Sequence, residues 1–264
     1  MGEYDALLGL ATGVAAEAAT LVARMRSEGV DVSATKSSPV DVVTRADEAA
    51  QRLIRSRLLG ARPDDGFLGE EGGHVAGTSG VRWVVDPIDG TVNYLYGTPE
   101  YAVSIAAELA GRMVAGVVHA PATGVVHAAT LGGGSTCDGV PLWVRDVVEV
   151  RQRLILTGFG YGEELRRRQG GYVAAMLPRV RDIRRRGACA LDLCTIGAGL
   201  ADGYVEEGVN LWDHAAGALV ATEAGATFAL LRSPSGNDLI VCSPKGGFDE
   251  FLVLLNECGF VGNT

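Results

Sequence analysis

The chain has 264 residues, of which 47% are hydrophobic and 21% are charged, an ordinary composition for a folded protein with a substantial core. That length fits one large domain or two closely packed lobes. The net charge of -9 at pH 7 argues against a general nucleic-acid binder, because such proteins are usually basic. An acidic enzyme with an anionic substrate would need a local cation, which a bound metal would supply.

Five cysteines occur without a CxxC pair or a zinc-ligand spacing, which predicts reduced and mostly buried thiols. The apolar stretch near the N-terminus follows Glu3 and Asp5, and Glu17, Arg24 and Arg26 interrupt or flank it. This pattern predicts neither a signal peptide nor a membrane-spanning helix. We therefore expect a cytoplasmic protein without membrane contact.

Two helices are predicted at the start of the chain. Residues 4–28 are rich in Ala and Leu, contain no proline and predict a helix that ends at Gly29. A second helix should begin after Thr44, a suitable N-cap, with Asp47 in its first turn. Its apolar face recurs at helical spacing and consists of Leu53, Ile54, Leu58 and Leu59.

The rest of the chain alternates between strand-like and helix-like segments. Residues 66–69 predict a short strand or turn, residues 101–130 predict three antiparallel strands, and residues 132–135 predict a loop. Further strands are predicted at 153–159, 203–208 and 239–243, and helices at 170–177, 191–201 and 212–224. This mixture predicts an α/β (α+β) protein whose sheets are covered by helices.

The segment WVVDPIDGTVNY, residues 83–94, is the most informative part of the sequence. Its β-branched valines predict a strand, which Pro87 and Gly90 end within a few residues. The turn after the strand therefore carries Asp86 and Asp89, with a backbone carbonyl between them and the Thr91 hydroxyl just beyond. This all-oxygen set is the kind that hard cations such as magnesium prefer, and it suits phosphate chemistry.

Other acidic residues stand at the ends of predicted elements. Glu70 and Glu71 follow a turn, and Asp47 and Asp213 lie near the starts of helices. Taken singly, Asp47 and Asp213 are more typical of residues that stabilise a helix start than of metal ligands. Only convergence with Asp86 would make them part of one site.

Five sequence blocks, in order over about the whole chain, resemble the inositol monophosphatase family. GEE (69–71), DPIDGTVN (86–93) and WDHAAG (212–217) are similar to its three signature blocks. KSSPVDVVTRAD (36–47) resembles its N-terminal block, and RRGACALDLC…ADGYVEEG (185–208) resembles its substrate-recognition region. The composite pattern is similar to the bacterial branch of the family.

The resemblance implies a layered αβαβα sandwich of the inositol monophosphatase and fructose-1,6-bisphosphatase type. An N-terminal lobe, residues 1–145, would carry most metal ligands, and a C-terminal lobe, residues 146–264, would carry Asp213 and the substrate-recognition residues. The implied activity is magnesium-dependent hydrolysis of myo-inositol monophosphate to inositol and phosphate by metal-activated water. The family pattern also implies a homodimer and sensitivity to lithium.

The resemblance further implies a ligand set for two Mg²⁺ ions. A third, weaker ion near Glu70 would bring the number to three. Glu70, Asp86 and the Ile88 carbonyl would hold one ion. Asp86, Asp89 and Asp213 would hold a second, with Asp86 as the bridge. Four clustered carboxylates would otherwise repel one another, so the set itself calls for cations or for strongly raised pKa values.

The remaining roles also come from the resemblance. Thr91 and Asp47, with Glu70 beside them, would orient and deprotonate the attacking water, and Lys36 would be an electrostatic partner. The implied substrate-binding residues are Asp89, Gly90, Thr91, Gly187, Ala188, Cys189, Glu206 and Asp213. For Lys36 an exposed loop position, for Glu206 a solvated turn and for Cys189 a simple packed thiol remain open.

Two further questions stay open in the sequence. The substrate could instead be histidinol phosphate, fructose 1,6-bisphosphate or adenosine 3′,5′-bisphosphate. The basic run 179–186 could make the chain a regulatory protein that binds RNA or the transcription machinery. Asp182 interrupts that run and no aromatic stacking platform accompanies it, which favours a solvated face or a subunit contact. His214 should pack in the core, because successive helix residues point about 100° apart.

Overall fold

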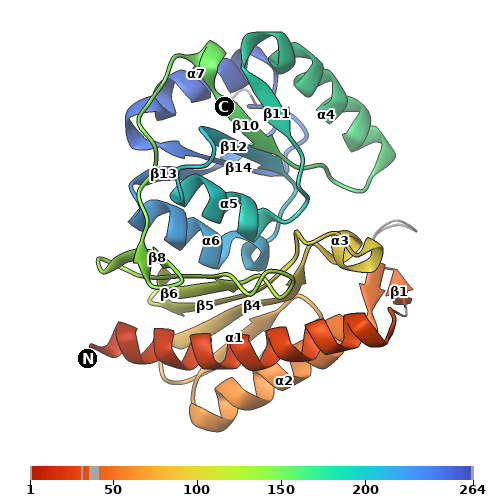
Figure 1. The fold of residues 1–264 in the computed structure, drawn as a ribbon, viewed down its shortest axis with the longest axis vertical. Coiled ribbons are helices and arrows are strands. Elements are labelled where there is room, and N and C mark those ends of the chain that lie inside the picture. Colours follow the sequence, from red (N-terminus) through yellow and green to blue (C-terminus); the bar gives the residue numbers. More distant parts are fainter. Residues whose placement is uncertain (1, 31, 36–41, 263–264) are drawn as a thin grey trace.

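Two β-sheets alternate with three layers of helices in the computed structural model, which describes residues 2–30, 32–35 and 42–262. From bottom to top in Figure 1 the layers are α1 with α2, a seven-stranded sheet, α5 with α6, a five-stranded sheet, and α4 with α7. The predicted αβαβα sandwich is confirmed. The helices are α1 (Glu3–Glu28), α2 (Arg45–Ala61), α3 (Thr91–Tyr96), α4 (Glu163–Met176), α5 (Cys189–Gly197), α6 (Leu211–Glu223) and α7 (Phe248–Glu257).

The seven-stranded sheet has the order β3-β4-β5-β6-β7-β8-β9, with β3 parallel to β4 and the other pairs antiparallel. Its strands are β3 (Gly66–Gly69), β4 (Val81–Asp89), β5 (Ala102–Leu109), β6 (Arg112–His119), β7 (Val126–Thr130), β8 (Gly134–Cys137) and β9 (Val140–Pro141). Helices cover both faces, so Trp83, Val84 and Val85 of β4 are all buried. The β4–β5 register shifts between Asp86 and Asp89, where the acidic turn begins.

The five-stranded sheet has the order β11-β10-β12-β14-β13. Its strands are β10 (Leu154–Thr157), β11 (Asp182–Arg184), β12 (Gly203–Glu207), β13 (Ala226–Arg232) and β14 (Asp238–Pro244), and a separate pair is formed by β1 (Val32–Thr35) and β2 (Val42–Thr44). Alternate residues face opposite layers. Leu156 and Tyr204 therefore pack toward α5 and α6, whereas Ile155 and Val205 pack toward α4 and α7.

The central helix α6 packs against both sheets and is built from small residues. A Cβ placed at Gly116 of β6 would lie 3.1 Å from the Ala216 Cα, and one at Gly217 would lie 2.8 Å from the Ala190 carbonyl of α5. Side chains no larger than these let the layers approach closely. The close packing brings the starts of α5 and α6 to the end of β4, where the acidic turn lies.

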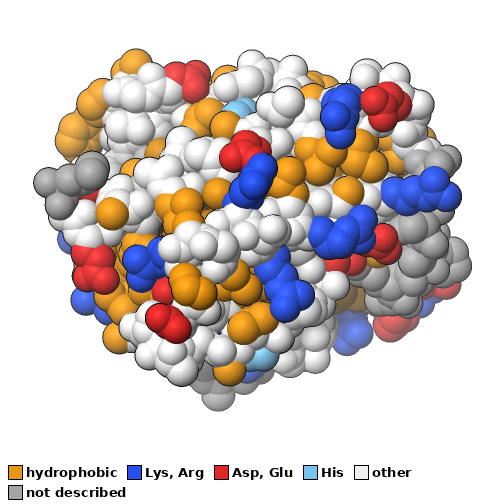
Figure 2. All heavy atoms as spheres, turned by 90° about the horizontal axis from the view of Figure 1, so that it is seen from below, with side chains coloured by type: hydrophobic (Ala, Val, Ile, Leu, Met, Phe, Trp, Pro, Cys, Tyr) orange, Lys and Arg blue, Asp and Glu red, His pale blue; other side chains and the backbone are white. Residues whose placement is uncertain are grey.

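By length and composition, α1 could cross a membrane, and 39% of its most apolar window is buried inside the fold. Ala11, Ala15 and Ala18 have no exposed surface and belong to the core between the helix layer and the seven-stranded sheet. Figure 2 views this side of the molecule, where apolar, basic and acidic side chains are interspersed. Core packing is therefore sufficient to explain the apolar character of α1.

Several predicted boundaries are wrong, for local reasons. Gly134 and Ser135 begin β8 instead of lying in a loop. The helix predicted at 170–177 begins at Glu163, because its first turns are charged and exposed and show no apolar period. The helix predicted at 191–201 spans Cys189–Gly197 and is followed by Gly199 at a φ of +69°. The division into lobes at 145/146 stays a prediction, although the strands of each large sheet lie on one side of it.

Candidate active site

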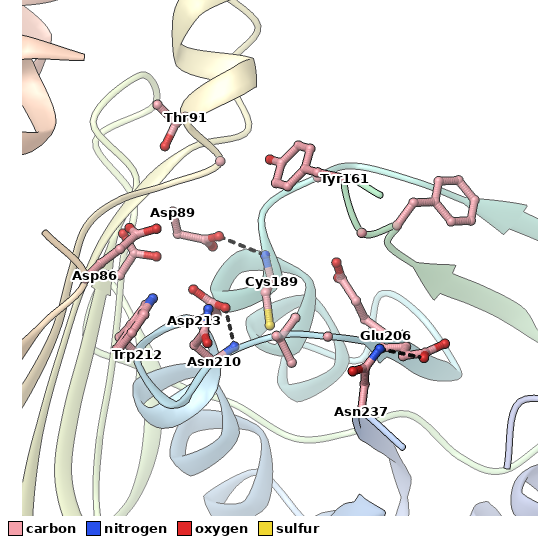
Figure 3. A pocket seen from close by; sticks show the side chains of 18 of the residues that line it. Asp86, Asp89, Thr91, Tyr161, Cys189, Glu206, Asn210, Trp212, Asp213 and Asn237 are labelled. Carbon is pink, nitrogen blue, oxygen red and sulfur yellow. Dashed lines mark hydrogen bonds between the residues drawn. The ribbon is translucent and has the colours of Figure 1, made fainter. Parts of the chain in front are cut away.

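A cavity of 460 Å³ lies where β4 ends and α3, α5 and α6 begin. Figure 3 shows Asp86, Asp89 and Asp213 at one end of it, and Glu206 with Asn237 at the other. The predicted site residues that line the cavity are Glu70, Asp86, Ile88, Asp89, Gly90, Thr91, Gly187, Cys189, Glu206 and Asp213. Side chains from both halves of the sequence therefore converge, which no single segment could demonstrate.

The acidic end of the cavity concentrates negative charge in a poorly solvated place. Asp86 and Asp89 are only 2% and 7% exposed. Burial raises the pKa of Asp86 well above its ordinary value, and the nearby Glu70, Asp89 and Asp213 carboxylates raise it further. Burial, followed by the charge of Glu70, raises the pKa of Asp213 to about 7. The cluster therefore holds protons or cations more readily than separate carboxylates would.

Backbone N–H groups fix the orientation of each aspartate. Asp89 accepts hydrogen bonds from the Cys189 and Ala190 amides at the start of α5, at 3.1 and 2.8 Å. Asp213 accepts one from the Asn210 amide at 2.6 Å in a capping box of α6. Asp86 accepts one from the Ile88 amide at 3.0 Å. Asp213 is thus both a helix-start residue and part of the cavity.

The donor set fits a hard divalent cation by its chemistry. Carboxylates and the Ile88 residue supply oxygen at this end of the cavity, and two like charges about 4 Å apart repel by roughly 4 kcal/mol at an effective dielectric of 20. Among the described residues, no group of three or more His, Cys, Asp or Glu side chains is already arranged as ligands of one ion. The ligand assignments therefore stay predictions.

Asp47 reaches the cavity only through Thr91. It is fully buried in the capping box of α2, where its Oδ2 accepts from the Thr44 amide at 2.8 Å and from the Thr44 hydroxyl at 2.5 Å. Its Oδ1 lies 3.2 Å from the Thr91 hydroxyl oxygen, which is also 3.0 Å from the Ile88 carbonyl. Burial is the largest cause that raises the pKa of Asp47 to about 6.

The loop 187–189 lies against the acidic turn. Gly90 has a φ of +86°, and a Cβ there would lie 2.8 Å from the Glu100 carbonyl and 3.1 Å from the Gly187 carbonyl. The turn therefore requires glycine for its backbone conformation and for space. Ala188 is buried and does not line the cavity, unlike Gly187 and Cys189. Lys36 lies outside the described residues.

Part of the cavity wall was absent from the sequence prediction. One part of this wall follows β10 and consists of the loop Phe159–Gly162 and Leu165. The rest consists of Arg185, Asn210, Trp212 and Asn237. The glycine-rich FGYG stretch directly after a predicted strand was a usable signal for a cavity loop. His214 packs on Phe228 with ring centroids 5.4 Å apart, as predicted for a core residue.

Comparisons with known proteins agree with this fold and cavity. The profile of the inositol monophosphatase family matches residues 3–253. Inositol-1-monophosphatase SuhB of Mycobacterium tuberculosis is 42% identical over 278 residues, which cover 95% of this chain and 93% of that protein. The solved structure of Mycobacterium tuberculosis SuhB has a TM-score of 0.85 and covers 99% of this chain and 100% of its own.

Two more distant relatives carry other names or ligands. Nus factor SuhB of Vibrio cholerae is 32% identical over 247 residues, which cover 91% of this chain and 92% of that protein. The solved structure of inositol monophosphate bound SaIMPase-II is 25% identical, has a TM-score of 0.76, and covers 95% of this chain and 93% of its own. The family match, together with the acidic cavity, makes the chain a phosphomonoesterase. The chain belongs to the inositol monophosphatase family.

Proposed function

We propose that this chain hydrolyses inositol 1-phosphate to inositol and phosphate with the help of Mg²⁺. The observation that carries the proposal is the convergence of Glu70, Asp86, Asp89 and Asp213 on one cavity. The names of relatives at 42% identity support the substrate, and so does the inositol monophosphate in the related SaIMPase-II structure. The hydroxyl-rich inositol would lie toward Glu206, whose carboxylate can accept hydrogen bonds.

The phosphate would lie at the acidic turn. Two Mg²⁺ ions would be held by oxygen atoms of Glu70, Asp86, Asp89, Asp213 and the Ile88 carbonyl. A third, weaker ion would lie near Glu70. When bound, such ions supply positive charge for the phosphate oxygens and lower the pKa of water. The Gly90 and Thr91 amides at the start of α3 would donate hydrogen bonds to the phosphate.

Thr91 and Asp47 would prepare the attacking water. The Thr91 hydroxyl can accept a hydrogen bond from water while it donates its own proton to Asp47 or to the Ile88 carbonyl. Asp47 has a pKa of about 6, near the operating pH of a cytoplasmic enzyme, which suits a proton acceptor. The Thr44 hydroxyl and amide keep Asp47 in place for this role.

The proposal extends to the setting of the enzyme. The all-oxygen donor set favours Mg²⁺, and lithium would inhibit by competition at one of its positions. All five cysteines are free thiols, in keeping with a cytoplasmic location. A homodimer is the expected assembly, with residues 1–145 and 146–264 as the two lobes of each subunit.

A substitution in the acidic turn tests the metal-dependent chemistry. Asp89→Asn should lower phosphate release about 10²–10³-fold, because it removes a charge and one acceptor oxygen from the site. The matched control is Asp249→Asn, since Asp249 is an exposed acid in the first turn of α7. Phosphate release that persisted in Asp89→Asn, or in excess EDTA, would contradict the proposal.

A substrate panel tests the proposed ester. With Mg²⁺ present, kcat/KM should be compared for inositol 1-phosphate, histidinol phosphate, fructose 1,6-bisphosphate and adenosine 3′,5′-bisphosphate. We expect inositol 1-phosphate to lead by at least about tenfold, worth about 1.4 kcal/mol in the transition state. A tenfold lead for another ester would keep the chemistry and replace the substrate.

A role as an RNA-binding or regulatory protein has weaker support. Arg179 pairs with Glu257, Arg184 with Asp182, and Arg186 bonds the Thr195 hydroxyl at 2.7 Å. Arginines paired with carboxylates, as Arg179 and Arg184 are, offer less charge to a nucleic acid. Charge reversal at 184–186 would test partner binding separately from phosphate release.

A further inference from the structure

The carboxylate of Glu206 lies beside a buried tyrosine of its own strand. Tyr204 and Glu206 are two residues apart in β12, so both side chains project from the same face of the five-stranded sheet. That face packs against α5, where Tyr204 belongs to a core cluster with Cys189 and Leu193. Tyr204 has no exposed surface, so its ring has a fixed position.

The Tyr204 hydroxyl connects this core to the cavity. It donates a hydrogen bond to Glu206 Oε2. The Cys189 side chain belongs to the same buried cluster as the Tyr204 ring. A phenol has one proton, and that proton lies on the bond to Glu206. Glu206 Oε2 is thereby occupied within the protein, whereas the other carboxylate oxygen is left for the cavity that Glu206 lines.

The Glu206 carboxylate also lies directly against a glycine. Gly158 directly follows β10, the parallel neighbour of β12. A Cβ at position 158 would overlap the Glu206 Cδ and both carboxylate oxygens. Both the tyrosine hydroxyl and the absence of a side chain at 158 are therefore needed for this rotamer of Glu206.

We propose that Tyr204 and Gly158 are positioning residues that fix Glu206 so that one of its oxygens accepts hydrogen bonds from the alcohol part of the substrate. The inference rests on the proposed function, in which Glu206 contacts inositol hydroxyls. It goes further because it identifies Tyr204 and Gly158 as the residues that make Glu206 select hydroxyl-rich esters. An ester without hydroxyls does not use Glu206, so its hydrolysis does not depend on Tyr204.

The ratio of kcat/KM for inositol 1-phosphate to that for p-nitrophenyl phosphate tests the proposal, because a loss of folded protein cancels in the ratio. Tyr204→Phe should lower this ratio about tenfold, mainly through KM for inositol 1-phosphate. Gly158→Ala should lower it in the same way, by displacing Glu206. In a Glu206→Gln background, Tyr204→Phe should change the ratio by less than about twofold.

Tyr94→Phe is the matched control, because the Tyr94 hydroxyl is also buried and donates to the Val22 carbonyl at 3.2 Å. It should leave the ratio unchanged even if stability falls. A ratio in Tyr204→Phe within about twofold of the wild type would overturn the inference. Failure of the proposed function would instead appear in the wild type, as no preference for inositol 1-phosphate over the other esters of the panel.

Discussion

Two aspartates of the site each combine a structural with a chemical role. Asp47 and Asp213 occupy the same position in the capping boxes of α2 and α6, where each accepts a hydrogen bond from the amide at its helix start. The same residues lie beside the acidic turn, Asp213 in the cavity and Asp47 behind Thr91. A helix start places a carboxylate with little freedom, which suits a site that depends on position.

The Thr91 hydroxyl should matter more than the methyl group of this residue. Thr91→Ala removes the contacts to Asp47 and to the Ile88 carbonyl and should lower kcat about 10²–10⁴-fold. Thr91→Ser keeps the hydroxyl and should retain activity within about tenfold of the wild type. Steady-state kinetics with inositol 1-phosphate at saturating Mg²⁺ make the comparison. Equal activities of the Ala and Ser variants would contradict the role given to the hydroxyl.

At the scale of elements, the junction of β4 with α3 organises the site. β4 ends in the register shift between Asp86 and Asp89, and Gly90 then adopts a left-handed conformation before α3 begins. The Asp89 carboxylate bonds two amides of α5, so the end of β4 and the start of α5 are held together. This contact joins segments about a hundred residues apart in the sequence.

Two glycines have similar backbone angles but different amounts of space around them. Substitutions at these positions therefore distinguish the effect of backbone strain from the effect of steric overlap. Gly90 and Gly80 have φ values of +86° and +87°, but a Cβ at Gly80 would meet only the Leu109 side chain at 3.7 Å. Gly80→Ala should cost stability through backbone strain of about 1–2 kcal/mol and leave kcat/KM unchanged. Gly90→Ala must also displace the Glu100 or Gly187 carbonyl, and should lower kcat/KM about 100-fold. Phosphate-release kinetics and thermal unfolding of both variants provide the comparison, and equal effects on kcat/KM would exclude the close approach as the cause.

The sequence predicts the parts of this fold whose signals are local. The capping pattern at Thr44 and the strand–turn WVVDPIDG were sufficient to place α2 and the acidic turn. β13 and α7 were not predicted, although Phe251, Leu254 and Leu255 of α7 recur at helical spacing and were a usable signal for that helix. The hydrogen bond from Tyr204 to Glu206 could not be predicted either, since it depends on which face of β12 meets α5.

At the scale of the whole molecule, the layered fold gives the acidic cluster a rigid but electrostatically unfavourable place. The cavity lies between two sheets that share α5 and α6, so the core on both sides limits how far the carboxylates can separate. Burial raises the pKa of Asp86 and of Asp89 well above the ordinary value. The cluster therefore reduces the stability of the metal-free fold at neutral pH in exchange for cation affinity.

The pH dependence of stability should consequently differ without and with Mg²⁺. Asp213 has a folded-state pKa of about 7, far above the value of about 3.9 expected in the unfolded chain, so the folded state holds more protons near neutrality. An excess of protons in the folded state means that the free energy of unfolding falls as pH rises. In EDTA, Tm should therefore be higher at pH 7 than at pH 8.

Magnesium competes with these protons, so in saturating Mg²⁺ the difference should shrink or reverse, and Tm should rise at pH 8. A ligand at about 100 times its Kd adds about 2.7 kcal/mol to the free energy of unfolding. The comparison is made between pH 7 and pH 8 because His214 opposes the effect at lower pH. Burial lowers the pKa of His214 to about 4, so near pH 6.5 this histidine takes up a proton only in the unfolded chain. Thermal unfolding followed by circular dichroism at both pH values tests this prediction. In EDTA, Asp213→Asn should lose part of the difference in Tm between pH 7 and pH 8. A metal-free protein that is more stable at pH 8 than at pH 7 would show that the buried carboxylates do not control its stability.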